Sequence, residues 1–234
     1  MVDRCITVVI IIIVIVFILI GLALVWWEDK PLVPTPPPPV PATTTDRLTY
    51  TQYVSAKAGQ STQQEIKATD GSILGEARQV FLTPPTKEPA MVRVGDGSVK
   101  YTYRGEGSNG FELRWLGYTN HSTVPIVDLS DLQKFTVEVS ELDFINENTT
   151  FTLQLNVSDK EGLESSVVDI VKGPKTATFD RDLFIGNEPG QHIDFANVTA
   201  IWMGGDFRTV NAQGEDSLTR GGNVTLKPLT FVRS

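Results

Sequence analysis

The stretch Ser98–Leu116, SVKYTYRGEGSNGFELRWL, decides the expected fold. Apolar and polar residues alternate in Ser98–Arg104 and again in Phe111–Leu116, and the glycine-rich segment 107–110 separates them. Successive side chains of a strand point to opposite faces, so this alternation is typical of strands with one buried face, and glycine, serine and asparagine are typical of turns. The stretch therefore predicts two strands connected by a turn.

The same alternation continues along the chain. Four further segments show it: 77–83, 135–139, 151–157 and 198–203. Short strands separated by turn residues, with hardly a helical period among them, are typical of a sandwich or jelly roll. Threonine, glutamine, glutamate, arginine and lysine take the polar positions, so each sheet is expected to be buried on one face only. The sequence predicts an all-β jelly-roll or β-sandwich domain over residues 50–234.

An uncharged apolar run precedes this domain: Ile6–Trp27, ITVVIIIIVIVFILIGLALVWW. As a helix it would extend about 33 Å, enough to cross a hydrocarbon core of about 30 Å, and lipid tolerates only backbones that satisfy their own hydrogen bonds. The run is longer than the apolar part of a signal peptide and ends in Trp26-Trp27, a pair suited to the membrane interface. We expect a retained transmembrane helix over 6–27, with the lipid bilayer as a partner.

The charges beside this run predict its orientation. Arg4 and the α-amino group, offset by Asp3, leave the tail 1–5 net positive, whereas residues 28–30 are net negative. Positive flanks tend to stay in the cytoplasm. We therefore expect a single-pass membrane protein with a cytoplasmic N-terminus and a C-terminal domain outside the cell or in a lumen.

Residues 28–49 are predicted to form a proline-rich spacer. Pro31–Pro41, PLVPTPPPPVP, holds seven prolines in eleven residues, which excludes a helix or a central strand. A polyproline II segment rises about 3.1 Å per residue, so it would hold the domain roughly 30 Å from the bilayer. The alternative is a ligand for SH3-like or WW-like domains, which would require a cytoplasmic location.

Composition argues against several functions. The formal charge of -8 and the pI near 4.8 disfavour a basic nucleic-acid surface, so no nucleic-acid partner is expected. The chain has no G-x-S-x-G or phosphate-loop motif, and its two histidines, His121 and His192, are far apart. We therefore predict no enzyme. Two carboxylate pairs of the kind used by glycosidases keep that alternative open: Glu138 with Glu141, and Asp180 with Asp182.

Aromatic residues are the candidates for a sugar-binding platform. We assign this role to Tyr101, Tyr103 and Tyr118. Trp115 and Trp202 lie on alternating strands and are assigned to the core, where aromatic residues contribute most of their buried area. Glycans are therefore one expected class of partner.

A resemblance to a known family appears around Asp70–Val80, DGSILGEARQV. This stretch resembles the "G-x-ILGG-x-RD-V" opening of secreted bacterial jelly-roll domains that often carry a sorting signal, and residues 111–118, 127–130 and 193–201 are similar to later elements of that family. The resemblance covers 71–225 and implies a galactose-binding-like jelly roll at a surface, without a catalytic set. Gly75-Glu76 replaces the family's double glycine, and the sorting tail is missing from this sequence.

The resemblance also implies one metal alternative, since similar jelly rolls sometimes hold a structural calcium ion. Asp70, Glu76 and Asp96 lie in glycine-rich turns and offer the oxygen ligands that calcium prefers. No other cofactor is expected. Among the N-x-[ST] sequons, Asn120 and Asn148 lie in predicted loops and are the best candidates for glycosylation.

Two hypotheses follow. The first is a non-enzymatic structural protein that tethers a membrane to a neighbouring coat or surface-layer protein; its architecture resembles a membrane-anchored minor capsid protein of a large DNA virus. The alternative is a cell-surface module that binds carbohydrate or protein. A tether would lie among neighbouring proteins, whereas a surface module would expose a sugar-dependent or calcium-dependent site.

Overall fold

The computed structural model describes residues 46–57, 59–83, 89–106, 109–117, 124–186, 188–209 and 219–234. The tail 1–5, the predicted transmembrane helix 6–27 and the spacer up to residue 45 lie outside these residues. Within the part of the chain that is described, no helix is long and apolar enough to cross a membrane.

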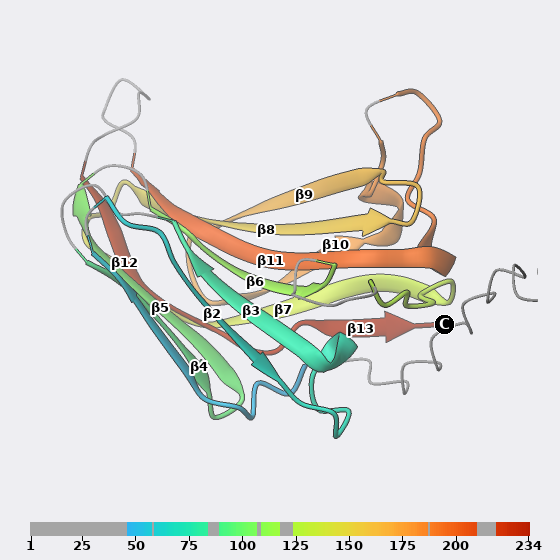
Figure 1. Ribbon diagram of the computed structural model, residues 1–234. Coiled ribbons are helices and arrows are strands. Elements are labelled where there is room, and N and C mark those ends of the chain that lie inside the picture. Colours follow the sequence, from blue (N-terminus) through green and yellow to red (C-terminus); the bar gives the residue numbers. More distant parts are fainter. Residues whose placement is uncertain are drawn as a thin grey trace, which may run out of the picture. The chain divides into compact units, whose positions relative to one another are not determined.

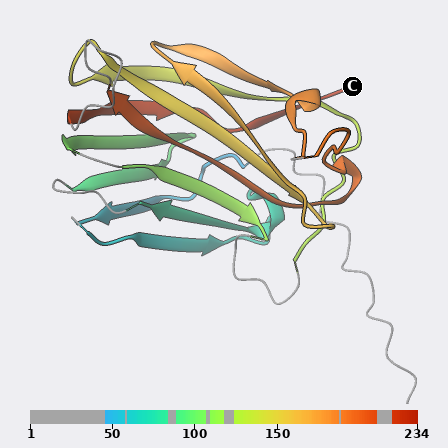
Figure 2. The ribbon, with the colours of Figure 1, turned by 90° about the horizontal axis from the view of Figure 1, so that it is seen from above.

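The described chain forms two antiparallel sheets packed as a sandwich (Figure 1). Sheet A has the order β1 (Gln52–Ala56), β4 (Ala90–Gly95), β5 (Ser98–Glu106), β12 (Thr219–Leu226), β7 (Leu132–Phe144), β10 (Lys175–Asp180), and β13 (Thr230–Arg233) also pairs with β7. Sheet B has the order β2 (Thr62–Lys67), β3 (Ala77–Leu82), β6 (Phe111–Leu116), β11 (Val198–Thr209), β8 (Thr149–Asp159), β9 (Glu164–Val171). Figure 2 shows the strands of sheet B side by side.

Three 3-10 turns complete the described structure: η1 (Leu74–Glu76), η2 (Arg181–Leu183) and η3 (Phe195–Asn197). The predicted all-β class and β-sandwich are confirmed, and the two-sheet arrangement is consistent with a jelly roll. The stretch that predicted two strands forms β5 and β6, but they belong to different sheets. The glycine-rich connection therefore leads from sheet A to sheet B, which the alternation alone did not indicate.

The core lies between the inner faces of the two sheets. Val99, Tyr101 and Tyr103 of β5 are fully buried, and Phe111 and Trp115 of β6 are 1 % exposed. Each large apolar side chain buried in this way contributes about 1.5–3 kcal/mol to folding. A second aromatic group surrounds Phe135 of β7, whose ring centre lies 5.2–6.4 Å from those of Phe184, Phe195 and Phe231. It packs the turns η2 and η3 and strand β13 against β7.

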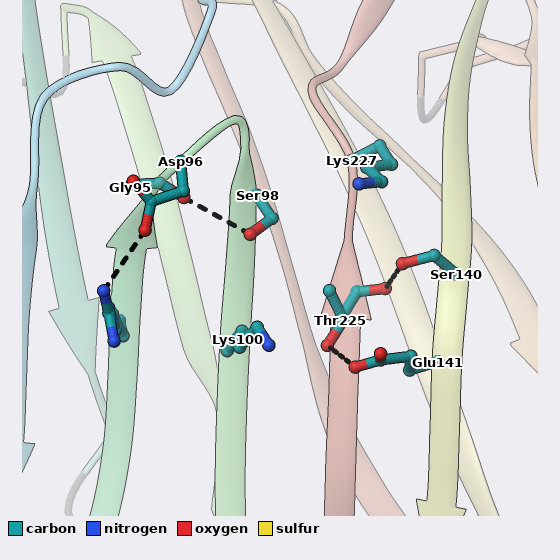
Figure 3. A pocket seen from close by; sticks show the side chains of 9 residues that line it. Gly95, Asp96, Ser98, Lys100, Ser140, Glu141, Thr225 and Lys227 are labelled. Atoms are coloured by element: carbon teal, nitrogen blue, oxygen red, sulfur yellow. Dashed lines mark hydrogen bonds and ion pairs between the residues drawn. The ribbon is translucent and has the colours of Figure 1, made fainter.

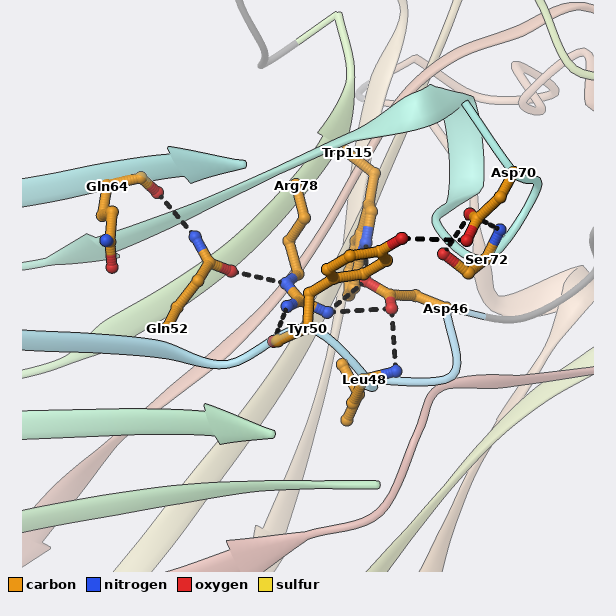
Figure 4. A network of polar contacts seen from close by, with 9 residues as sticks. All are labelled: Asp46, Leu48, Tyr50, Gln52, Gln64, Asp70, Ser72, Arg78 and Trp115. Carbon is orange, nitrogen blue, oxygen red and sulfur yellow. Dashed lines mark hydrogen bonds and ion pairs between the residues drawn. The ribbon is translucent and has the colours of Figure 1, made fainter. Parts of the chain in front are cut away.

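A buried ion pair connects the sheets at one end of the sandwich (Figure 4). Arg78 of β3 is 0 % exposed, and its Nη1 lies 2.7 Å from Oδ2 of Asp46, which precedes β1. Trp115 Nε1 also donates to Asp46 Oδ2 (2.9 Å), and the main-chain N of Leu48 donates to Asp46 Oδ1 (2.9 Å). Asp46 is therefore held by three donors and is almost completely buried.

The remaining donors of Arg78 are satisfied by the chain around β1. Its Nε donates to Gln52 Oε1 (2.7 Å) and its Nη2 to the carbonyl of Tyr50 (2.8 Å). Gln52 in turn donates from Nε2 to the carbonyl of Gln64 on β2 (3.1 Å), which links sheet A to sheet B a second time. Burial lowers the pKa of the Arg78 guanidinium, while the charge of Asp46 and the hydrogen bond to it act in the opposite direction.

Because of this network, the folded domain begins earlier in the chain than the sequence predicted. Asp46 and Leu48 are 3 % and 2 % exposed, although the sequence placed them in the spacer and began the domain at Tyr50. The folded region therefore includes at least the segment 46–49. The polar threonines before Asp46 made this segment resemble a linker, and nothing in the local sequence indicated that the Asp46 side chain is buried.

Arg78→Leu is expected to destabilise the domain by about 3–5 kcal/mol, because it leaves the buried Asp46 carboxylate without its cation. Urea unfolding of the full chain and the variant measures this. Arg93→Leu is the control: Arg93 and Asp96 form an exposed ion pair at 3.2 Å, with 59 % and 80 % of the side chains exposed, and its loss should cost about 1 kcal/mol or less. Equal midpoints for the two variants would contradict the assigned role.

Candidate functional site

The outer face of sheet A carries a row of polar side chains across four strands. The pairing register aligns Arg93 of β4 with Lys100 of β5, Lys100 with Thr225 of β12, and Thr225 with Glu141 of β7. Tyr53 of β1 pairs with Arg93, and its side chain is 58 % exposed. An exposed aromatic ring therefore stands at one end of a row of charged and hydroxyl groups.

A hollow of about 400 Å³ lies over this row. We call it the sheet A hollow; its lining residues are Arg93, Gly95, Asp96, Ser98, Lys100, Ser140, Glu141, Thr225 and Lys227. The pairing of β12 with β7 shifts between Thr225 and Leu226, which face Glu141 and Val139, so Ser140 is an extra residue in β7. Such a bulge locally disrupts the ladder and redirects side chains, and it places Ser140 and Glu141 together at the hollow.

Most polar groups of the sheet A hollow already have partners (Figure 3). Thr225 Oγ1 donates to Glu141 Oε2 (2.7 Å), and Ser140 Oγ donates to the carbonyl of Thr225 (3.2 Å). Arg93 Nη2 donates to Asp96 Oδ2 (3.2 Å). Lys100 and Lys227 differ from these groups, because their ammonium groups have no ion-pair or hydrogen-bond partner among the described residues.

The outer face of sheet B presents a different surface, centred on Trp202 of β11. Val80 and Leu113 of other strands and Met203 of β11 itself point into the core. Trp202 alternates with Met203 and therefore lies on the outer face, where it is half-buried. Its neighbours along the strand on this face, Ala200 and Gly204, are small. The indole is therefore not flanked along its own strand by any large side chain.

Polar side chains flank Trp202 across the sheet. Arg114 of β6 and Asn156 of β8 are its register partners on the two sides. Arg114 Nε donates to Glu112 Oε2 (2.6 Å), and its guanidinium lies 4.3 Å from the ring centre of Phe81. Asn156 Nδ2 donates to Ser166 Oγ (2.8 Å). We call this set, with Trp202 at its centre, the Trp202 face.

The glycines of β11 allow this strand to fit closely between its neighbours. A Cβ atom at Gly204 would overlap the carbonyl of Phe111, and one at Gly205 would overlap the ring of Phe151 and the carbonyl of Thr152. β11 is visibly curved (Figure 1). Gly204 also contributes no side chain to the outer face, where its register partners are Glu112 and Gln154.

Two of the three tyrosines predicted to form a sugar-binding platform are buried. Tyr101 and Tyr103 are both 0 % exposed, so the expectation that they contact a sugar is wrong. They share the inner face of β5 with Val99, and the hydroxyl of Tyr101 donates to Asn109 Oδ1 (2.6 Å), which makes its burial tolerable. Burial raises the pKa of Tyr101 well above its ordinary value. Tyr118 lies outside the described residues.

The two tryptophans assigned to the core differ. Trp115 is 1 % exposed, as predicted, and donates to Asp46. Trp202 lies on the outer face instead, so its assignment to the core was wrong. Trp115 shares a face with Phe111 and Leu113 and alternates with the polar Glu112 and Arg114, so periodicity indicated its burial. The first six residues of β11 (VTAIWM) are largely apolar on both faces, so periodicity could not assign Trp202 to the inner or the outer face.

The three predicted calcium ligands do not form one group, and two of them have other partners. Asp70 accepts hydrogen bonds from Ser72 and from the hydroxyl of Tyr50 (2.8 Å), and the Ser72 hydroxyl is the main cause that lowers the pKa of Asp70. Asp96 pairs with Arg93. Within the described ranges, no three His, Cys, Asp or Glu side chains are grouped so that they could hold a metal ion. A calcium site that includes Glu76 stays a prediction.

The other candidate residues are scattered. Asn148 is exposed in the turn between β7 and β8, whereas Asn120 and His121 lie outside the described residues. Glu138 and Glu141 are both exposed on β7. His192 lines a second hollow of about 360 Å³ with Arg181, Asp182, Phe184, Ile193 and Phe195, and it forms a β-bridge with Ile185. Use of the sequons stays a prediction.

Comparison with known proteins finds similar solved structures but no matching protein-family model and no matching curated protein. The family 11 carbohydrate-binding module of a cellulosomal cellulase of Clostridium thermocellum is 10% identical, with a TM-score of 0.38, over 79% of this chain and 88% of that chain. TmCBM61, solved with beta-1,4-galactotriose, is 13% identical, with a TM-score of 0.35, over 81% and 92%. An exo-beta-agarase is 10% identical, with a TM-score of 0.36, over 79% of this chain and 23% of its own. Likenesses this distant carry no argument about function, and the β-sandwich class rests on the described sheets.

Tyr101→Phe is expected to reduce stability by about 1–2 kcal/mol, because it removes a buried hydrogen bond to Asn109. Binding of any ligand should be unchanged, since the hydroxyl does not reach the surface. Urea unfolding and a binding titration of the full chain measure the two effects. Tyr53→Phe, at an exposed tyrosine, is the control for stability. Loss of binding in Tyr101→Phe without loss of stability would contradict the burial of this residue.

Proposed function

We propose that this protein binds glycans, without catalysing a reaction on them, through the Trp202 face of sheet B. One observation carries the proposal: a tryptophan on the solvent side of a sheet lies between two small residues of its own strand and two polar residues of the neighbouring strands. The indole is half-buried, so part of it reaches solvent on the side of the sheet that faces away from the core.

The residue types of the Trp202 face suit a sugar ring. An indole ring offers a flat apolar surface for the C–H groups of a pyranose. Arg114 and Glu112 on one side, and Asn156 and Gln154 on the other, carry planar polar groups that can hydrogen-bond pairs of neighbouring hydroxyls. A few such groups around an apolar surface are the usual composition of a small-molecule site.

Gly204 lies two residues after Trp202 on the same face, between Glu112 and Gln154 in the register. It is buried, and a Cβ atom there would overlap β6, so this position serves the close packing of β11. The apolar surface proposed for the sugar is therefore the indole of Trp202 itself.

The proposed location is the outer or lumenal side of a membrane, to which the run Ile6–Trp27 would anchor the domain. The length and lack of charge of this run support an anchor. Glycan binding at that side would attach the membrane to a carbohydrate-bearing surface. This combines the anchor and spacer of the first hypothesis with the carbohydrate-binding module of the second.

A second candidate function is attachment to a neighbouring coat or surface-layer protein, as in the minor capsid hypothesis. Val168 and Ile170 of β9 favour it, because they are 51 % and 59 % exposed on a strand at the edge of sheet B. Edge strands with exposed apolar residues are sites where another chain can add. Recovery of such a protein by the full chain, lost on Ile170→Lys, would support this function in place of glycan binding.

Trp202→Ala is expected to weaken glycan binding about tenfold or more, because it removes the apolar surface of the site. The full chain in detergent is screened on a glycan array, and the affinity of the best ligand is measured by titration. Tyr53→Ala, which removes an exposed aromatic side chain from sheet A, is the matched control and should bind normally. Equal binding by Trp202→Ala and the unmodified chain, with both folded, would overturn the proposed site.

A further inference from the structure

We infer that the sheet A hollow binds an oxyanion, a carboxylate, sulfate or phosphate group, carried by a hydroxylated ligand. Lys100 and Lys227 would hold the anionic group, and Glu141 would accept hydrogen bonds from its hydroxyls. This inference is independent of glycan binding by the Trp202 face, since the two surfaces lie on the outer faces of different sheets.

The side chains that line the hollow carry one positive charge in excess, and two of the cations have no ion-pair partner among the described residues. Three cationic and two anionic side chains line it. Arg93 pairs with Asp96, and Glu141 accepts the hydroxyl of Thr225. Among the residues that the structure describes, no side chain pairs with Lys100 or Lys227. Two unpaired ammonium groups in one hollow are notable in a chain whose net charge is -8, where carboxylates are abundant.

The sheet register places the two lysines close enough to share one anion. Lys100 lies opposite Thr225, and Lys227 follows Thr225 by two residues, so the lysines are diagonal neighbours on adjacent strands. Such neighbours are separated by about 7–8 Å, well within the reach of two lysine side chains. In Figure 3 the Lys100 side chain extends from β5 toward β12, and the Lys227 side chain stands at the end of β12. Like charges at this spacing repel, and an anion between them would remove the repulsion.

The far side of the hollow has the opposite chemistry. Glu141 is two strands away from Lys100, a separation of about 10 Å between their backbones across the sheet. Its carboxylate would repel an anion but can accept hydrogen bonds from hydroxyl groups. Thr225 and Ser98, which are 7 % and 8 % exposed, form the floor between the two sides. The arrangement therefore suits a ligand with an anionic end and a hydroxylated end.

The test titrates the full chain with glucuronate, glucose, inorganic sulfate and inorganic phosphate at about 10 mM ionic strength, where screening is weak. Glucuronate is expected to bind in preference to glucose. The double variant Lys100→Gln/Lys227→Gln should weaken glucuronate binding about tenfold or more. Lys57→Gln/Lys160→Gln removes the same charge at two exposed positions outside the hollow and should have little effect.

Glu141→Gln tests the hydroxylated part of the ligand. It should tighten the binding of sulfate and phosphate by removing a negative charge, while the preference for glucuronate over these ions falls. Equal affinity for inorganic ions and glucuronate in the unmodified chain would overturn the assignment of a hydroxylated ligand. Equal losses in the two lysine double variants would overturn the site itself. Trp202→Ala should leave this binding unchanged, so failure here is separable from failure of glycan binding at sheet B.

Discussion

The buried pair of Arg78 and Asp46 is the constraint on which the arrangement of the two sheets depends. A guanidinium that is fully removed from water is tolerated only when its charge and its donors are matched, and here every partner comes from the segment 46–52. That segment must therefore cross from the start of β1 to β3 and β6. The two sheets are consequently fixed relative to each other at this end by polar contacts as well as by the core.

Apolar residues fill the inner faces of the two sheets, so the candidate ligand sites lie on the outer faces. The two outer faces differ in the side chains that they present. Sheet A carries, beside a bulge in β7, two lysines that no described residue pairs with, and sheet B carries Trp202 beside the glycines of β11. Both features occur where a strand departs from regular geometry. The bulge redirects side chains of β7 toward the hollow, whereas the glycines let β11 pack closely against its neighbours.

The sequence predicted the strands better than the site residues. Alternation shows that a strand has two faces, but it identifies the buried face only where one face is polar. By this rule β5 was clear: Val99, Tyr101 and Tyr103 alternate with polar residues, so the pattern placed the tyrosines on the buried face and the predicted sugar platform went against it. The start of β11 was ambiguous because Val198–Met203 is largely apolar on both faces, and Trp202 was therefore assigned to the wrong one. Asp46 was missed because nothing near it in the sequence indicates its partner.

The sequence by itself determined the all-β class, six of the thirteen described strands, and the apolar run that predicts a membrane anchor, because these depend on residues a few positions apart. Tertiary structure decided which residues meet. Asp46 with Trp115 and Lys100 with Lys227 are far apart in the chain and are brought together by the order of strands in each sheet. Strand order depends on how whole faces of the sheets pack. The local pattern of one strand is compatible with many neighbouring strands, so hydrophobic periodicity does not predict the strand order.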